Sequence, residues 1–364
     1  MGFKCGIVGL SNVGKSTLFN ALTQSAAAEA ANYPFTTIEP NIGEVPVPDP
    51  RLQKIFEIAG SAAMTPARLT FVDIAGLVRG ASKGEGLGNQ FLGQIREMDA
   101  IAHVLRCFDD DNVSHVEGRI DPVGDTETVE TELMLADIES LEKRVTPLEK
   151  KIRGGDKQAG AILDLVREAQ DTLNSGQPLR LAGTTRAGAG FAGLELITAK
   201  PVLYVCNVDE EAAASGNAHS AKVADYAKGQ GAGMVVIAAK IEAELAQLGA
   251  GERDEYLAAL GLDEPGLNRM IRAGYELLGL ITFFTANANE TRAWTIPRGT
   301  SALKAAGVVH TDFEKGFVRA ETIAFEDYLA CGGEAGARDA GKMRLEGKDY
   351  LVKDGDVLRF RSAP

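Results

Sequence analysis

The N-terminal part of the chain contains a glycine-rich run with the spacing of a phosphate-binding loop. The sequence GLSNVGKST, from Gly9 to Thr17, matches G-x-x-x-x-G-K-[ST] and lies between a strand-like run and a helix-like run. In such a loop, backbone N–H groups turn toward one anion, and the start of the following helix adds a positive partial charge. The lysine reaches the β and γ phosphates, and the hydroxyl after it binds a magnesium ion. The pattern predicts that a nucleoside triphosphate is bound at this loop, with Lys15 at its phosphates and Mg²⁺ on Ser16.

A second element has the pattern D-x-x-G, from Asp73 to Gly76, at the end of the strand-like run Leu69 to Ile74. In P-loop enzymes the aspartate holds the Mg²⁺ shell, and the glycine N–H contacts the γ phosphate. Between the two elements, Thr36 and Thr37 lie in a loop flanked by prolines. Adjacent residues in an extended segment point in opposite directions, so only one of these two hydroxyls is expected to bind the metal ion.

The residues after the fourth predicted strand favour adenine over guanine. GTPases usually carry N-K-x-D at this place, and its aspartate accepts two N–H bonds from guanine. This chain has Asn207, Val208, Asp209 and Glu210 instead. A site without the guanine-matched acid loses its strongest discrimination, so we expect ATP, with Asn207 and the Val208 backbone near the base. The alternative is that the polar residue only caps the next helix.

Hydrolysis must be organised without the glutamine that related GTPases use, because Leu77 follows Gly76. Water has to be positioned by another group, and His115, in an acidic loop after a predicted strand, is the candidate. A plain surface histidine is the alternative. The expected catalytic residues are therefore Lys15, Gly76 and His115. Asn12 is also a candidate ligand for a monovalent cation such as K⁺, which would offset phosphate charge.

The candidate residues follow apolar runs that are typical of buried parallel strands. Five such runs alternate with helix-like stretches, which predicts an α/β P-loop NTPase domain built on a parallel sheet. In such sheets, ligands bind outside the carboxyl ends of the strands, and the candidate residues lie there. The runs are Cys5 to Gly9, Leu69 to Ile74, Ile101 to Phe108, Val202 to Val208 and Met234 to Ala238.

A charged segment from about Asp125 to Gln177 lies between the third and fourth strands and has heptad-like spacing. The spacing predicts an antiparallel helical hairpin, and two amphipathic helices lying on the sheet are the alternative. Its apolar positions are Ile138, Leu141, Val145, Leu148 and Ile152, then Ile162, Val166, Ala169 and Leu173. Near the turn we expect either phosphate contacts or a solvated surface, because basic residues gather there: Lys143, Arg144, Lys150, Lys151, Arg153 and Lys157.

After Gly279 the chain changes to short β-type runs separated by one helix-like segment, Ser301 to Ala306. The β-type runs are Ile281 to Thr285, Thr291 to Ile296 and Val357 to Arg361. This change predicts a separate α+β domain. We therefore expect a nucleotide-binding domain over 1–124 and 196–280, an inserted helical domain over 125–195 and a C-terminal domain over 281–364.

Composition narrows the class of protein further. The chain has 364 residues, with 38 Lys and Arg against 51 Asp and Glu, so the net charge is −13 and a nucleic-acid coat over the whole surface is disfavoured. No apolar run reaches the roughly 20 residues of a membrane span, and the N-terminus lacks the apolar region of a signal peptide. We expect a cytoplasmic monomer that contacts no membrane. The four cysteines are far apart, so neither disulfides nor a zinc site are expected, and His103, in an apolar strand, is expected in the core.

In their order along the chain, four segments resemble the Obg-like ATPase, or YchF, family of TRAFAC-class P-loop NTPases. They are Gly9 to Thr17, Asn32 to Gly43, Asp73 to Val78 and Asn207 to Glu210, and the match spans the whole chain. The resemblance implies an Obg-related P-loop domain, an inserted antiparallel coiled coil and a C-terminal ubiquitin-like (β-grasp) TGS domain. The stretch from His310 to Glu321 represents the last of these.

The resemblance also implies an activity and its residues. ATP is preferred to GTP, a hydrophobic residue that matches Leu77 replaces the glutamine, and a loop histidine that matches His115 aids hydrolysis. Ser16 and Thr37 would bind Mg²⁺, and Val208 would meet the base. The residues at the phosphates would be Asn12, Val13, Gly14, Lys15, Ser16 and Thr17. The resemblance implies binding to ribosomes and an association with oxidative-stress regulation, although no two cysteines are arranged in this sequence for an evident switch.

The leading hypothesis is a slow ATPase that acts as a nucleotide-dependent switch on the translation machinery. Three other classes stay open: an Obg-type GTPase, a P-loop phosphotransferase that acts on a small metabolite, and a ribosome-binding scaffold in which the nucleotide is only structural. They differ in the preferred nucleotide, in the acceptor of the phosphate, and in whether Lys15→Ala changes ribosome association.

Overall fold

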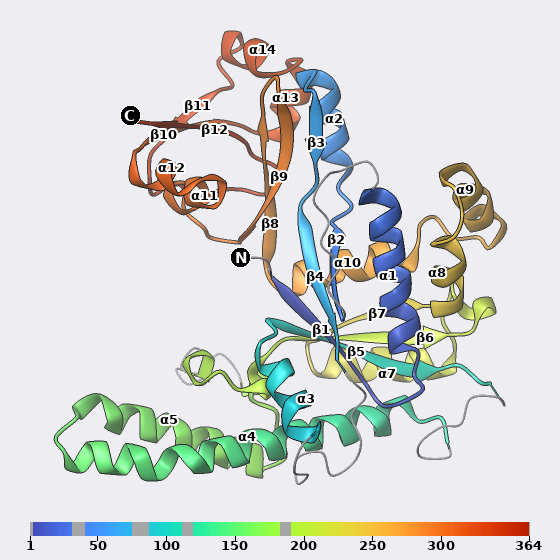
Figure 1. Ribbon diagram of the computed structural model, residues 1–364, viewed down its shortest axis with the longest axis vertical. Coiled ribbons are helices and arrows are strands. Elements are labelled where there is room, and N and C mark those ends of the chain that lie inside the picture. Colours follow the sequence, from blue (N-terminus) through green and yellow to red (C-terminus); the bar gives the residue numbers. More distant parts are fainter. Residues whose placement is uncertain (1–2, 31–40, 75–86, 111–118, 183–190, 364) are drawn as a thin grey trace.

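The structure of the chain is a computed structural model that describes residues 3–30, 41–74, 87–110, 119–182 and 191–363. Two six-stranded sheets and one long pair of helices dominate the described part (Figure 1). None of the helices in these ranges has the length and apolar content that a membrane span requires.

The first sheet has the strand order β2-β4-β1-β5-β6-β7. All of its strands except β2 are parallel, and they confirm the five predicted runs to within one residue at each end. β2 runs antiparallel to β4 and was missed, because this edge strand buries only every second residue and shows no continuous apolar run. The strands are β1 (Lys4–Val8), β2 (Ile42–Pro46), β4 (Arg68–Asp73), β5 (Ala100–Cys107), β6 (Val202–Val208) and β7 (Gly233–Ile237).

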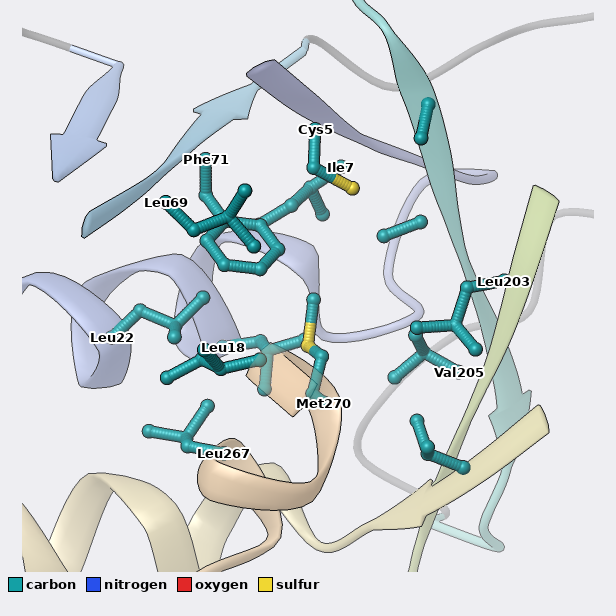
Figure 2. Packing of buried hydrophobic residues seen from close by; sticks show 14 of the residues in the cluster. Cys5, Ile7, Leu18, Leu22, Leu69, Phe71, Leu203, Val205, Leu267 and Met270 are labelled. Atoms are coloured by element: carbon teal, nitrogen blue, oxygen red, sulfur yellow. The ribbon is translucent and has the colours of Figure 1, made fainter. Parts of the chain in front are cut away.

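Helices α1 (Lys15–Ala30) and α10 (Gly266–Leu277) pack against one face of this sheet and form its main core. Figure 2 shows Leu18, Leu22, Leu267 and Met270 facing the strand residues Ile7, Leu69, Phe71 and Val205. Every residue of β5 and β6 is buried, as expected for inner strands of a parallel sheet covered on both faces. Shorter helices complete the domain: α3 (Leu87–Arg96), η5 (Glu210–Ala212), α7 (Ala218–Gly229), α8 (Ala239–Leu245) and α9 (Ala250–Ala259).

The predicted pair of helices is present as α4 (Pro122–Arg153) and α5 (Lys157–Asn174), which lie side by side and extend away from the first sheet (Figure 1). The first half of α4 packs on the sheet through Val129 and Leu133, whereas its later part shares a separate core with α5 around Leu141 and Val166. The helix therefore starts in one core and ends in another. Short 3-10 turns lead back to β6: η2 (Leu179–Leu181), η3 (Ala192–Leu194) and η4 (Ile197–Ala199).

Two predicted positions of the helix pair are wrong. Ile152, in the last turn of α4, is 38% exposed. Ile162 is 41% exposed, and Leu163, next to it, is buried at 5% exposed together with Ala159. The buried stripe of α5 is thus shifted by one residue near the turn. Adjacent isoleucine and leucine residues fit the heptad spacing almost equally well, so the sequence pattern alone could not choose between them.

The second sheet has the strand order β11-β10-β12-β8-β9-β3. The sequence predicted β8, β9, β12 and helix α11, but not the half-exposed strands β10 and β11. The strands are β8 (Leu280–Ala286), β9 (Glu290–Pro297), β10 (Phe317–Ile323), β11 (Arg344–Glu346) and β12 (Val357–Ser362). The helices of this part are α11 (Ala302–Val309), α12 (Thr311–Lys315), α13 (Phe325–Ala330) and α14 (Glu334–Asp339).

A segment from the N-terminal part completes the second sheet. Between β2 and β4 the chain forms α2 (Pro50–Ala59) and β3 (Ala63–Thr65), and β3 pairs in parallel with β9 (Figure 1). Arg51 of α2 links this segment to the second sheet. It forms ion pairs with Asp49 at 2.8 Å and Asp354 at 2.6 Å, and its guanidinium carbon lies 5.4 Å from the centre of the Phe284 ring. The first 124 residues thus contribute structure to both sheets.

Candidate nucleotide-binding site

A cavity of about 780 Å³ lies at the carboxyl ends of β5 and β6 and beside the loop between β1 and α1. Its size suits a small-molecule ligand such as a nucleotide. Of the predicted contact residues, Asn12, Gly14, Thr17, Asn207 and Val208 line it. The structure therefore brings together the phosphate loop and the segment predicted to meet the base.

The backbone of the phosphate loop adopts conformations that require particular residues at two positions. Asn12 and Gly14 both adopt positive φ angles, of 64° and 98°. At Gly14 a side chain would also collide, because an added Cβ would lie 2.3 Å from Nδ2 of Asn207. Glycine alone meets both conditions without strain, so the second glycine of the motif is fixed by its neighbour on β6.

Lys15 lies inside this loop and is only 7% exposed. Its Nζ donates a hydrogen bond to the Leu10 carbonyl at 2.6 Å. Burial lowers the pKa of Lys15 to about 8, and the nearby carboxylate of Asp73 opposes this shift. A buried ammonium held by one carbonyl has hydrogens left for further acceptors, and the phosphate oxygens of a nucleotide are acceptors of this kind.

Asp73 and Ser16 form the part of the site that fits a magnesium ion. The Ser16 hydroxyl donates to Oδ2 of Asp73 at 3.3 Å, while the buried Oδ1 has no hydrogen-bond partner among the described residues. Burial raises the pKa of Asp73, and the charge of Lys15 and the hydrogen bond from Ser16 oppose the rise. A hydroxyl beside an unsatisfied carboxylate oxygen is a donor set that Mg²⁺ prefers, completed by water and phosphate oxygens. The described ranges hold no cluster of three or more His, Cys, Asp or Glu side chains that could bind a metal ion without such partners.

Asn207 lies at the cavity, but both ends of its amide contact the protein backbone. Nδ2 donates to the Val13 carbonyl at 3.0 Å, and Oδ1 accepts from the Ala239 N–H at 2.9 Å. Asn207 therefore fastens the phosphate loop to the start of α8. It does not cap the next long helix, α7, because Asn217 is the N-cap of that helix.

Val208 is 4% exposed and lines the cavity together with Phe108 and Lys240. Glu210, which replaces the guanine-binding aspartate, faces Lys240, with 3.9 Å between Oε1 and Nζ. Phe108 and Lys240 were not singled out from the sequence. The rule that ligands meet the residues after the strand ends would have found both, since Phe108 follows β5 and Lys240 lies three residues after β7.

Several predicted site residues lie outside the described ranges. They are Thr36, Thr37, Gly76, Leu77 and His115. His103 is buried in β5 at 2% exposed, as predicted, and its Nε2 has no hydrogen-bond partner among the described residues. Burial, together with the positive charges of Arg180 and Lys15, lowers its pKa to about 3, so His103 is a neutral core residue.

The cysteines show one arrangement that their spacing in the sequence conceals. Cys5, Cys107 and Cys206 are buried in strands, and Cys331 is half-buried. The thiols of Cys107 and Cys206, on the neighbouring strands β5 and β6, interact with each other, and this interaction, together with burial, raises the pKa of Cys107. Two buried cysteines therefore lie close together, which their spacing in the sequence does not show, while the expectation that no pair forms an evident switch stays a prediction. All four cysteines are free thiols.

Comparisons with known proteins give matches at three levels. A family model described as "50S ribosome-binding GTPase" matches residues 4–145, and YchF-GTPase_C, described as "Protein of unknown function (DUF933)", matches residues 280–363. The chain is 54% identical over 361 residues to "Ribosome-binding ATPase YchF" of Escherichia coli O157:H7, with 99% of each chain covered. It is 52% identical over 364 residues to the protein of the same name from Bacillus subtilis (strain 168), again with 99% of each covered.

Among solved structures, "Structure of the Schizosaccharomyces pombe YchF GTPase" matches the chain with a TM-score of 0.88 and 37% identity. That match covers 99% of this chain and 98% of the solved one. The likeness therefore extends over both sheets and the helix pair, beyond the phosphate loop.

Proposed function

The chain belongs to the YchF family, and on this premise we propose that it is a Mg²⁺-dependent ATPase that hydrolyses ATP to ADP and phosphate and acts as a nucleotide-dependent switch on the ribosome. The observation that carries the proposal is the buried Lys15 in its phosphate loop beside Asp73, one oxygen of which has no partner. The relatives named ribosome-binding ATPases support the nucleotide and the partner. Association with ribosomes would place the protein in the cytoplasm, and we propose that it acts as a monomer.

We propose the following roles at the phosphates. Lys15 would turn its Nζ from the Leu10 carbonyl toward the β and γ phosphates, where its charge stabilises the transition state. Ser16, Asp73 and Thr37 would hold Mg²⁺, which supplies charge neutralisation for the phosphates when bound. The N–H of Gly76 would contact the γ phosphate, and Asn12 would bind K⁺ if a monovalent cation takes part.

His115 is proposed to position the attacking water, because Leu77 cannot do so. A slow intrinsic turnover is the expected consequence of the missing glutamine. The phosphate would pass to water, as the name ATPase of the relatives supports.

Adenine is the proposed base because the wall near Val208 does not carry the guanine-reading pattern N-K-x-D. Lysine is replaced by Val208, and the acid of Glu210 faces Lys240 across 3.9 Å. A guanine-reading acid would need both carboxylate oxygens for the base, and a neighbouring ammonium competes for them. The name of the Schizosaccharomyces pombe structure, a GTPase, makes GTP the second candidate nucleotide.

The domain limits remain a proposal as well: 1–124 and 196–280 for the nucleotide domain, 125–195 for an inserted coiled coil, and 281–364 for a TGS β-grasp domain. The tip of the helix pair is the proposed phosphate-binding surface. Two of its six basic residues are engaged within the chain, since Lys143 pairs with Glu139 at 2.6 Å and Arg144 donates to the Leu194 carbonyl at 2.8 Å. The remaining four are exposed: Lys150, Lys151, Arg153 and Lys157.

Co-sedimentation with ribosomes and nucleotide titration test the proposal together. We expect Mg-ATP to bind more tightly than Mg-GTP, and ATP and ADP to give different amounts of ribosome-bound protein. Lys15→Ala should lower ATP turnover at least a hundredfold and abolish that difference. Replacement of the four exposed tip residues by Glu should weaken ribosome binding, most of all at low salt. A tenfold preference for GTP, or a Lys15→Ala protein that still responds to nucleotide on the ribosome, would contradict the proposal.

A further inference from the structure

Arg106 is a buried cation at the carboxyl end of β5, where the nucleotide cavity begins. Its side chain is almost inaccessible, at 3% exposed for the residue. In the parallel pairing of β5 with β6, Arg106 is the register partner of Asn207. Register partners on neighbouring strands direct their side chains to the same face of a sheet. Arg106 therefore lies beside the residue that fastens the phosphate loop.

The guanidinium of Arg106 holds the segment that follows β5. Nε donates to the carbonyl of Phe108 at 3.2 Å, and Nη2 donates to the carbonyl of Asp110, also at 3.2 Å. Its central carbon lies 4.7 Å from the centre of the Phe108 ring, within the range of a cation–π contact. One side chain thus holds Phe108 by both its backbone and its ring.

The segment held in this way is part of the cavity wall. Phe108, Asp109 and Asp110 all line the cavity, together with residues that follow β6. Asn207 acts in the same manner, through Val13 of the phosphate loop and Ala239 at the start of α8. The register pair therefore fixes three separate segments that surround the same cavity.

We propose that Arg106 is a positioning residue of the nucleotide site, which holds Phe108 to Asp110 in the place where they meet the bound nucleotide. The inference rests on the proposed function, since it requires ATP to occupy this cavity. Lysine cannot replace Arg106 in this role, because an ammonium lacks the planar fork that bonds two carbonyls and stacks on a ring. ATP and ADP differ only in the γ phosphate. The affinity for each nucleotide should therefore depend on Arg106.

The test compares R106K with R96K. Arg96 also donates to a backbone carbonyl, that of Ala136 at 3.4 Å, but it does not line the cavity, so R96K is the matched control. Calorimetric titration of R106K should give at least tenfold weaker binding of both Mg-ATP and Mg-ADP, and the KM for ATP should rise by the same factor with a smaller change in kcat. Without nucleotide, the melting temperature of R106K should fall no further than that of R96K. A purely structural role predicts the reverse: a lower melting temperature and unchanged affinities.

F108L provides a second measurement that can be made even if R106K does not fold. The variant removes the ring but keeps the carbonyl to which Arg106 donates, so it should weaken the binding of both nucleotides by a smaller factor than R106K. The effects of R106K and F108L should combine to less than their product, because both remove the same ring contact. Affinities of R106K or F108L within twofold of the wild type would overturn the role of Arg106. Failure of the wild type to bind either nucleotide would overturn the proposed function instead.

Discussion

The phosphate loop with its neighbour Asp73 and the base of the helix pair both contain buried carboxylate oxygens, but only those at the base have all the partners that they need. There, Glu130 of α4 accepts from Arg180 and from the Tyr204 hydroxyl, the latter at 2.9 Å. Asp137 accepts at both oxygens, from the N–H of Ile197 at 3.0 Å and from Thr198 at 2.8 Å. Beside Ser16 of the phosphate loop, Oδ1 of Asp73 accepts from none of the described residues.

The difference separates structure from function within one chain. A buried polar group that is fully hydrogen-bonded stabilises a single arrangement of the chain. A buried group that lacks a partner costs stability until a ligand supplies one. Changes at the base and in the helix pair should therefore alter stability and leave nucleotide binding intact, and changes in the cavity should do the opposite.

The largest effect on stability is expected from Glu130→Ala. It leaves Arg180, whose side chain is 10% exposed, as a buried charge without its carboxylate. Removal of one partner of a buried ion pair costs about 3 kcal/mol or more, so urea denaturation should show that loss. The affinity for Mg-ATP should stay within twofold of the wild type at temperatures where the variant is folded. A stable variant with weakened ATP binding would remove the distinction between the two regions.

A somewhat smaller effect is expected from Leu163→Ala on the buried side of α5. Leu163 is 5% exposed, and truncation of a buried leucine to alanine costs about 2.5 kcal/mol. Its neighbour Ile162 is 41% exposed and serves as the matched control, with an expected loss of less than about 0.5 kcal/mol for Ile162→Ala. Urea denaturation of the two variants checks the assignment of the buried stripe. Equal losses would show that the helix pair does not pack as described.

The smallest effect is expected from a change of pH, which alters the charge of Lys15 in the phosphate loop and hence the affinity for ATP. Burial lowers the pKa of Lys15 to about 8, so the free protein loses this charge above pH 8. Phosphates stabilise the ammonium form, which raises the pKa in the complex, and binding above pH 8 must then take up a proton. ATP affinity should therefore fall as the pH rises, to about a tenth at pH 9 of its value at pH 7. Titration at the two pH values measures this ratio, and Lys15→Ala should bind weakly at both. Equal wild-type affinities would mean that Lys15 stays charged in the free loop.

Much of the first sheet and the phosphate loop could be predicted from local sequence. Buried parallel strands are continuous apolar runs, and the loop motif fixes its own backbone through glycines such as Gly14. Strand β2 and strands β10 and β11 are half-exposed and lack such a run, and β3 has only three residues. Their pairing depends on partners elsewhere in the chain, which local pattern does not contain.

The contacts of the site side chains were the hardest part to predict. The position of Asn207 near the nucleotide cavity followed from its place after a strand, but its amide bonds Val13, which is 194 residues away in sequence, and Ala239. Arg106 appeared only as one residue of an apolar run, and its role depends on carbonyls that turn back toward it after the strand ends. Residue type and spacing show which loops meet, whereas hydrogen-bond partners follow from the folded backbone.

The short strand β3 has a consequence for the order in which the protein can be completed. Thr65 and Ser61 bond to Glu290 and Thr291, which are 225 and 230 residues later in the chain. During synthesis, one face of α2 and the free edge of β3 stay uncovered until β8 and β9 have been synthesised, near the end of the chain. A fragment that stops before Leu280 would expose both of them as a site for aggregation. Loss of the last quarter of the chain would thus make the part that carries the phosphate loop prone to aggregation.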